Sequence, residues 1–390
     1  MTVTWDGPLK KYRSPEYNYD FNTLDGYFKR WGKTEDDDPK TGPIELMDLE
    51  IDERCEGIPS PGKDVATPCT FCYKSNTQVG RYMTFETFKG IFDKLPQSLM
   101  QIAFGIGNIG DNGHPDLFKF FDYCINNEHN PGVIPNITTN GYGLTPEIAD
   151  KIKFYGGGVA VSRYENKDVC YNAVKTLTDA GILQVNIHQV ISVESLQSCY
   201  DLIDEAATDP RLEKMRYILF LTLKPKGKRN KWHVLKDVNE YRKLIEYAWS
   251  KDIAIGFDSC SAPTFLASIK DHPNFAEMNE MTEACESDRF SGYANVEGIW
   301  SHCSFTEGLE NWGTVDLKVI EDFDRDLWNA PVVKKFRECL TCQNNDHIGK
   351  DVFLCPVYKL YDDQIGNSPT AIDGDIPNTF KGIKIGVKHG

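Results

Sequence analysis

The stretch IELMDLEIDERCEGIPSPGKDVATPCTFCYKS, residues 44–75, joins a run of strand character to a loop with three cysteines. The strand-like run covers residues 44–51 and leads into Cys55. Thirteen residues then separate Cys55 from Cys69, whereas only two separate Cys69 from Cys72. Because this spacing suggests metal ligation, we expect a metal site at the end of a first strand.

The chain after this loop alternates strand-like and helical patterns up to about residue 258. Thr84 and Thr145 stand where helix N-caps belong. Six strand–helix units in a row predict an α/β fold with a parallel sheet, either open or curled into a partial (βα)6 TIM-like barrel. Further strands are expected at 99–107, 132–141, 157–164, 183–192 and 216–225, with helices at 84–95, 114–125, 145–156, 167–181, 195–207 and 237–252.

Polar and glycine-rich segments fall where the predicted strands end. Parallel sheets place their active sites at these carboxyl ends, so the segments are candidate site residues. They are the Cys55 loop, Gly105 to Asn108, Thr139 to Gly141, Ser162 with Arg163, and the chain from Lys224 onward.

Three regions are expected along the chain. Residues 1–44 are polar, with an acidic run at 35–38, and are predicted to be an N-terminal extension that wraps the next domain. Residues 45–256 form the strand–helix domain. In residues 257–390 the alternation stops and cysteines become frequent, which predicts a small cysteine-rich C-terminal domain.

Composition excludes several functions. The formal net charge of −15 disfavours a grip on nucleic acid, which needs a basic face. The basic run 224–231 is interpreted as a solvated loop, or as a site-flanking segment that steers an acidic substrate. The chain has no run of 18 apolar residues, so we expect no membrane span. Twelve cysteines without a secretion signal indicate reduced thiols and a cytoplasmic location.

The number of ligands in the first loop matters, because a structural zinc or a cubane iron–sulfur cluster normally takes four. Three cysteines leave one position open for a small molecule. The alternative is a structural zinc completed by a distant histidine. The position of the cysteines at the carboxyl end of a strand favours a reaction site over a structural zinc.

Here the sequence resembles the radical S-adenosylmethionine (SAM) enzymes, whose commonest cluster motif is C-x3-C-x2-C. Residues 56–68 would be an insertion in that motif, and the resemblance covers roughly residues 45–255. It implies that Phe71 and Tyr73 lie near the adenine. The segment FGIGNIGDNGHPDL, residues 104–117, resembles the family's GGEP segment for the methionine amino group. The other cofactor-binding residues that it implies are Gly105, Gly107, Asn108, Ser162, Arg163, Asn186, His188 and Lys224.

The resemblance implies a [4Fe-4S] cluster on Cys55, Cys69 and Cys72 with SAM on the open iron. One electron, from a donor such as flavodoxin or ferredoxin, would cleave SAM to a 5′-deoxyadenosyl radical that abstracts a hydrogen atom from the substrate.

A second cysteine group lies in the C-terminal region. The pattern C-x12-G-x4-C from Cys285 to Cys303 resembles the SPASM or twitch domains of that family, which hold auxiliary iron–sulfur clusters. We expect one auxiliary cluster here, while a zinc ribbon stays an alternative. Asp258 and Glu286 flank these cysteines and are candidate proton acceptors. The expected ligands are Cys285, Cys303, Cys339 and Cys342, with Cys260 and Cys355 as competitors.

The remaining cysteines, Cys124, Cys170 and Cys199, fall in helical patterns and are predicted to be buried. The leading functional hypothesis is modification of a ribosomally made peptide by cross-linking, epimerisation or excision, with leader recognition by a separate partner protein. The alternatives are a radical SAM dehydrogenase or mutase acting on a sugar or nucleoside, and a non-catalytic zinc-binding interaction protein.

Overall fold

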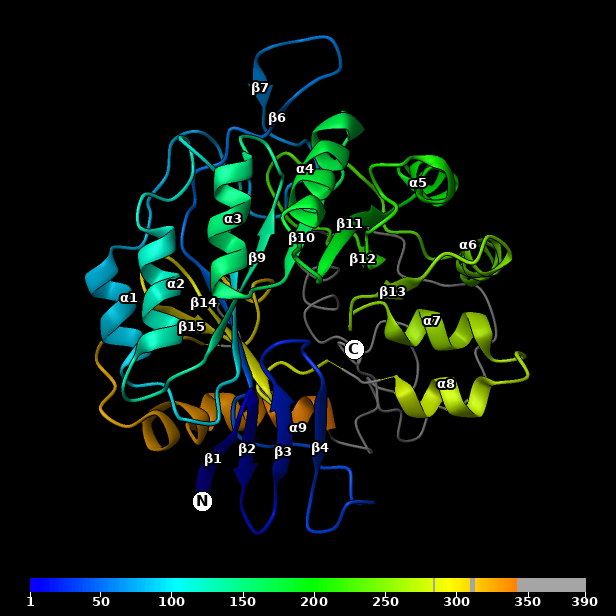
Figure 1. Cartoon of the computed structure of the whole chain (residues 1–390). Helices are drawn as coiled ribbons and strands as arrows, with labels where there is room; N and C mark the ends of the chain where they lie inside the picture. Colours follow the sequence, from blue (N-terminus) through cyan, green and yellow to red (C-terminus); the bar gives the residue numbers. More distant parts are fainter. Residues whose placement is uncertain (283–284, 309–312, 342–390) are drawn as a thin grey trace.

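A ten-stranded sheet forms the centre of the computed structural model, which describes residues 1–282, 285–308 and 313–341 (Figure 1). Its strand order is β13-β12-β11-β10-β9-β8-β5-β14-β15-β16, and the ladders from β13 to β14 are all parallel. The strands are β5 (Leu46–Glu50), β8 (Gln101–Gly105), β9 (Ile134–Thr139), β10 (Val159–Ser162), β11 (Val185–Ile191), β12 (Tyr217–Thr222), β13 (Ile255–Phe257), β14 (Ser291–Ala294), β15 (Ile299–Ser301) and β16 (Val315–Asp316).

Helices follow the strands in the predicted order. Thr84 and Thr145 cap α1 and α3 by accepting N–H bonds from Thr87 and Ile148, as expected. Figure 1 shows α1 to α4 beside one another along the strands. The helices are α1 (Phe85–Phe92), α2 (Leu117–Asn126), α3 (Pro146–Tyr155), α4 (Lys167–Asp179), α5 (Leu196–Thr208), α6 (Val238–Ser250), α7 (Ala262–Ile269), α8 (Phe275–Met281), the π-helix η1 (Asp324–Trp328) and α9 (Pro331–Thr341).

The two faces of the sheet differ in polarity because side chains alternate along each strand. In β8, Ile102 and Phe104 are buried in the main hydrophobic core. In β11, Asn186 and His188 occupy the half-buried positions, and His188 is level with Ser162 of β10. One face therefore packs on helices, and the other carries polar groups toward the carboxyl ends of the strands.

The predicted parallel sheet of six strands is confirmed, and the structure extends it at both edges. Within the described ranges no ladder joins β13 to β16, so the sheet is open. The predicted domain boundary at residue 256 falls inside β13, and β14 from the C-terminal region pairs with β5. The curling of the sheet into a partial barrel therefore stays a prediction, and so does a separate C-terminal domain.

The N-terminal residues form an antiparallel sheet of four strands, which the sequence analysis did not predict. These strands are β1 (Thr2–Asp6), β2 (Leu9–Arg13), β3 (Asn18–Asn22) and β4 (Phe28–Trp31). Tyr12, Tyr19 and Phe21 are buried with Met100 and Phe290 of the rest of the chain. The region thus packs onto the core as a folded element. None of the helices in the described ranges has the length and apolar character to cross a bilayer.

Candidate active site

The three cysteines of the first loop lie beyond the carboxyl end of β5. We call residues 55–77 the first cysteine loop. Its long gap is a hairpin of β6 (Ile58–Pro59) and β7 (Ala66–Thr67). Gly57 enters the hairpin at φ +77°, where an added Cβ would lie 1.9 Å from the carbonyl oxygen of Thr67. The 13-residue gap is therefore an ordered element and requires glycine at its base.

Two asparagines from neighbouring strand ends hold the base of this hairpin. Asn108 accepts a hydrogen bond from the Glu56 N–H at 2.8 Å and donates to the Gly57 carbonyl at 3.1 Å. Asn140 donates to the same carbonyl at 3.2 Å, and its Nδ2 lies 3.9 Å from the Cys55 sulfur. Asn108, predicted to contact SAM, thus has its amide engaged by the backbone that follows Cys55.

Close packing against Cys55 explains one predicted glycine. A Cβ on Gly107 would lie 2.7 Å from the Cys55 sulfur, so only glycine leaves the thiol its space. Gly105, at the end of β8, has open space in front of it, since the nearest atom to an added Cβ is the Leu49 carbonyl oxygen at 3.9 Å. The glycines at this strand end therefore leave room for the Cys55 thiol and keep the space in front of Gly105 open.

The environment of the CxxC pair favours a thiolate. A hydrogen bond from Cys69, together with backbone N–H groups of Asn76, Lys74 and Ser75, lowers the pKa of Cys72 against the effect of burial. Donating that hydrogen bond raises the pKa of Cys69. A thiolate is the form that binds metal, so this donor set fits metal ligation.

Among the described residues, no group of three Cys, His, Asp or Glu side chains is arranged to hold a single metal ion. The iron–sulfur cluster and the structural zinc therefore both stay predictions for the first cysteine loop.

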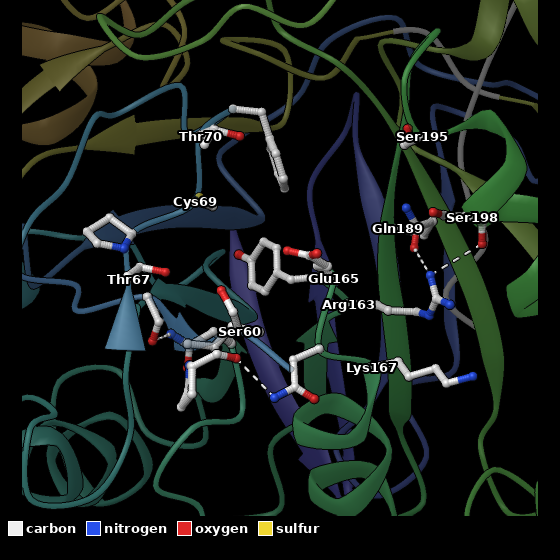
Figure 2. A pocket seen from close by; sticks show the side chains of 18 of the residues that line it. Ser60, Thr67, Cys69, Thr70, Arg163, Glu165, Lys167, Gln189, Ser195 and Ser198 are labelled. Carbon is white, nitrogen blue, oxygen red and sulfur yellow. Dashed lines mark hydrogen bonds between the residues drawn. The ribbon is translucent and has the colours of Figure 1, made fainter. Parts of the chain in front are cut away.

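A cavity of about 630 Å³ lies beside this loop, within the size range of small-molecule sites (Figure 2). The hairpin supplies one wall, and a hydrogen bond of 3.0 Å from Asn166 to the Pro59 carbonyl fixes it. The other residues used below that line the cavity are Cys55, Cys69, Phe71, Asn140, Arg163, Tyr164, Lys167, Gln189, Glu205 and Trp232.

Aromatic rings form one side of the cavity. The Phe71 and Trp232 rings are stacked with centroids 4.0 Å apart, and Tyr164 lies 5.7 Å from Phe71. Phe71 thus lines the cavity, and its place beside an adenine stays a prediction. Trp232 was missed because it comes from an irregular segment after β12. Tyr73 points elsewhere and packs on Phe305 at 4.8 Å, and burial raises its pKa to about 12.

Arg163 also lines the cavity and is held by protein groups. Its guanidinium donates to Gln189 at 3.1 Å and to the Ser198 carbonyl at 3.3 Å (Figure 2), and it also donates to Tyr171 at 2.9 Å and Glu205 at 3.1 Å. Four of the five N–H groups are therefore used within the described residues, which leaves one on Nη2. Any contact to a carboxylate must use that donor or displace Glu205.

The other predicted cofactor residues lie at adjacent strand ends. Ser162 ends β10 level with His188 of β11, and Asn186 lies level with Ala160 of β10. His188 follows on the same face of β11, and its carbonyl accepts the Arg163 N–H at 2.9 Å. The sheet thus brings these residues together beside the first cysteine loop.

Three of the six C-terminal cysteines are neighbours. Cys260 follows β13, Cys285 precedes β14 and Cys303 follows β15. The pKa of Cys260 is raised to about 12 and that of Cys303 to about 11, mainly by burial and in part by the charges of nearby cysteines. Cys339 lies in the last turns of α9, whereas Cys342 and Cys355 lie outside the described residues.

The two carboxylates predicted to accept protons form ion pairs with neighbouring side chains. Asp258 pairs with Lys224 at 2.8 Å and accepts the N–H of Ser261 at 3.0 Å. Glu286 pairs with Arg30 at 3.3 Å. Lys224, predicted near the nucleoside, lies 4.9 Å from the Phe305 ring. Catalytic roles for Asp258 and Glu286 therefore stay predictions.

The basic run 224–231 packs onto the first cysteine loop. Arg229 donates to the carbonyls of Ser75 at 3.2 Å and Asn76 at 2.7 Å, and Lys226 donates to the Glu307 carbonyl at 2.7 Å. The solvated-loop interpretation is thus wrong for these side chains, because each cation holds backbone carbonyls.

Comparison with known proteins finds similar solved structures. SuiB of Streptococcus suis bound to S-adenosylmethionine is 16% identical, with a TM-score of 0.58 over 82% of this chain and 74% of SuiB. SuiB bound to the precursor peptide SuiA is 14% identical, with a TM-score of 0.56 over 82% of this chain and 74% of SuiB. The protein anSMEcpe with bound AdoMet and a Cp18Cys peptide is 14% identical, with a TM-score of 0.51 over 83% of this chain and 96% of that one.

No protein-family model and no curated protein matches the chain. At these identities the structural likeness concerns the fold. It confirms the fold implied by the resemblance to radical SAM enzymes: a mixed α/β architecture around a large parallel sheet.

Proposed function

We propose that the protein is a radical SAM enzyme that modifies a peptide. The observation that carries this proposal is the position of Cys55, Cys69 and Cys72 at the carboxyl edge of the parallel sheet, with Cys55 and Cys69 lining a cavity of about 630 Å³. The shared fold with proteins that bind SAM supports it.

The first cysteine loop would hold a [4Fe-4S] cluster, and the cavity would hold SAM. When bound, these groups supply a 5′-deoxyadenosyl radical that removes a hydrogen atom from the substrate. Gly107 leaves room for the Cys55 thiol, and backbone N–H groups favour the Cys72 thiolate. The stacked rings of Phe71 and Trp232 offer an apolar face for an adenine, and the walls of the cavity limit access of water.

Cys260, Cys285 and Cys303 would hold an auxiliary cluster, with a further ligand from outside these three. The peptide substrate is the finer part of the proposal. It is supported by the crystal structures of SuiB with SuiA and of anSMEcpe with Cp18Cys, two proteins with the same fold.

An anaerobic assay with reductant and SAM tests the proposal through formation of 5′-deoxyadenosine. We expect wild type and Cys124→Ala to form it, because Cys124 is fully buried in α2 far from the loop, and Cys72→Ala to form none. A colourless protein that contains zinc and forms no 5′-deoxyadenosine would contradict the proposal.

Mass spectrometry against peptides encoded beside the gene then tests the substrate. A mass change that requires SAM and reductant in one such peptide is the expected result. Turnover of a sugar or nucleoside, with no change in any of these peptides, would contradict the peptide part alone.

A further inference from the structure

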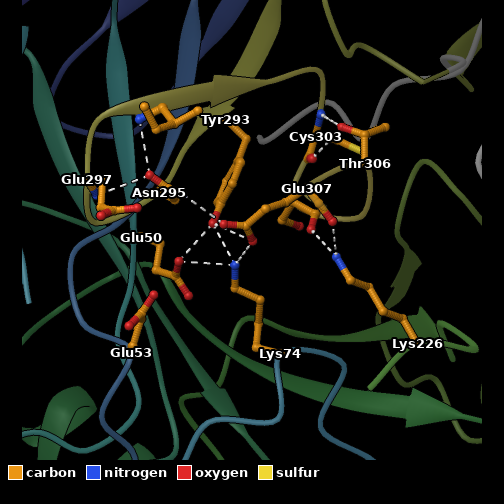
Figure 3. A network of polar contacts seen from close by, with 12 residues as sticks. Glu50, Glu53, Lys74, Lys226, Tyr293, Asn295, Glu297, Cys303, Thr306 and Glu307 are labelled. Atoms are coloured by element: carbon orange, nitrogen blue, oxygen red, sulfur yellow. Dashed lines mark hydrogen bonds and ion pairs between the residues drawn. The ribbon is translucent and has the colours of Figure 1, made fainter. Parts of the chain in front are cut away.

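A buried ion network joins the first cysteine loop to the C-terminal cysteine region (Figure 3). Its centre is Lys74, two residues after Cys72. The Lys74 ammonium lies 3.0 Å from Glu50 Oε2 and 2.7 Å from the Tyr293 hydroxyl, and it also pairs with Glu307. Since an ammonium has three N–H donors, these partners satisfy all of them.

The partners come from three different parts of the chain. Glu50 ends β5, and Tyr293 lies on the paired strand β14 and donates to Glu50 at 2.9 Å. Glu307 follows Cys303 by four residues, and Asn295 donates to its second oxygen at 3.0 Å. We call residues 303–308 the second cysteine loop. Lys74 therefore ties this loop to the first one and to two strands of the sheet.

Because the network is buried, its charges are poorly solvated and depend on one another. The side chains of Lys74 and Glu50 are only 12% and 8% exposed, and that of Glu307 is 25% exposed. Two carboxylates this close repel each other unless a cation lies between them. Removal of Lys74 would leave both charges uncompensated in a poorly solvated place, so the loops would separate or take up water.

One further contact joins the two loops directly, and a second joins them through the basic run 224–231, which packs onto the first cysteine loop. Tyr73 packs on Phe305 with ring centroids 4.8 Å apart. Lys226 donates to the carbonyls of Ser304 at 3.4 Å and Glu307 at 2.7 Å. The two cysteine loops, more than 200 residues apart, are therefore neighbours through apolar as well as polar contacts.

We propose that Lys74 is a positioning residue that fixes the second cysteine loop against the first, so that the two cysteine sites form as one unit. The geometric part of this inference concerns the chain alone. The part that concerns metal loading rests on the proposed function.

Thiol alkylation of the metal-free, full-length protein tests the geometric part, with mass spectrometry reading each cysteine. We expect Lys74→Met to raise the alkylation rate of Cys303 by roughly tenfold or more, because the second cysteine loop opens locally more often. Lys74→Arg keeps a cation and should restore a rate near that of wild type. Lys10→Met is the control, because Lys10 is even more deeply buried than Lys74 but contacts Leu99 and Asn130.

Glu307→Gln tests the same contact from the other loop and serves where Lys74→Met fails to fold. If the pair acts as a unit, the double variant alkylates at Cys303 hardly faster than the faster single variant. The inference is overturned if the single effects multiply. It is also overturned if Lys74→Met, like Lys10→Met, leaves Cys303 within roughly twofold of wild type.

Iron content after anaerobic reconstitution tests the metal part. Lys74→Met should bind less iron than Cys303→Ala, because it disturbs both sites while Cys303→Ala disturbs one. Equal iron in Lys74→Met and wild type would overturn the joint loading of the sites. If wild type itself binds no iron, the proposed function fails, and alkylation still decides whether Lys74 positions the loops.

Discussion

At the scale of single residues, the type of side chain at each strand end was predictable, but its partners were not. Arg163 was predicted to bind the cofactor, and it lines the cavity. Four of its N–H groups are directed at Tyr171, Gln189, Ser198 and Glu205. These partners lie on α4, β11 and α5, and only folding brings them together.

Trp232→Ala should weaken SAM binding without loss of cluster iron. The indole is stacked on Phe71 in the cavity wall, and aromatic–base stacking contributes about 1–3 kcal/mol, which corresponds to a roughly 5- to 150-fold higher Kd for SAM. Calorimetric titration of the reconstituted protein measures this Kd. Trp249→Ala, at an exposed site in α6, is the control. Equal Kd values for the two variants would remove Trp232 from the cofactor site.

Lys10 gives the protein a pH-dependent stability. Burial lowers the pKa of Lys10 from 10.5 to about 7. Between these values the unfolded chain binds the proton that the folded protein has released, so the free energy of unfolding rises with pH by at most about 1.4 kcal/mol per unit. Below pH 7 both states are protonated, and this contribution no longer changes.

Urea unfolding of wild type and Lys10→Met at pH 7, 8 and 9 measures this effect. The unfolding free energy of wild type minus that of Lys10→Met should increase with pH. The other titrating groups contribute equally to both proteins and cancel in this difference. Parallel pH profiles would contradict a neutral Lys10 in the folded state.

At the scale of elements, the strand–helix units were predictable because each carries its own hydrophobic period and, in two cases, a capping threonine. The hairpin of residues 56–68 was not. In the sequence this hairpin is only a departure from the C-x3-C-x2-C spacing, and no local pattern predicts β6 and β7. Its conformation depends on Asn108, Asn140 and Asn166, which belong to other strand ends.

Asn108→Ala should lower cluster iron and SAM binding together. The Asn108 amide holds Glu56 and Gly57, so its loss frees the backbone beside Cys55 and leaves the Glu56 N–H without this partner, at about 1–3 kcal/mol. Iron analysis and SAM titration measure the two effects. If SAM binding falls while iron content stays at the wild-type level, Asn108 contacts SAM directly, as the sequence resemblance implies.

At the scale of the whole molecule, the N-terminal sheet is part of the core. Tyr19 is fully buried, stacks on Tyr12 at 5.3 Å and donates to the Ser98 carbonyl at 2.8 Å. Arg30 pairs with Glu45 at 3.1 Å beneath the start of β5. Residues 1–31 therefore support the strand that leads into the first cysteine loop.

Tyr19→Ala should destabilise the whole protein by about 3–5 kcal/mol, as for other large aromatic truncations in a core. Tyr27→Ala, at a site that is 51% exposed, should cost less than about 0.5 kcal/mol. Urea unfolding followed by far-UV circular dichroism measures both. Equal midpoints for the two variants would mean that the N-terminal sheet is dispensable for stability.

The parallel sheet, its six strand–helix units and a cysteine loop at the end of the first strand were all predictable from the sequence. Those features rest on periodicity and spacing, which are local. Three other contacts follow from folding alone: β14 pairs with β5, Trp232 stacks on Phe71, and Lys74 pairs with Glu307. These contacts join distant segments, and their geometry depends on how the helices and the sheet pack, which no local pattern encodes.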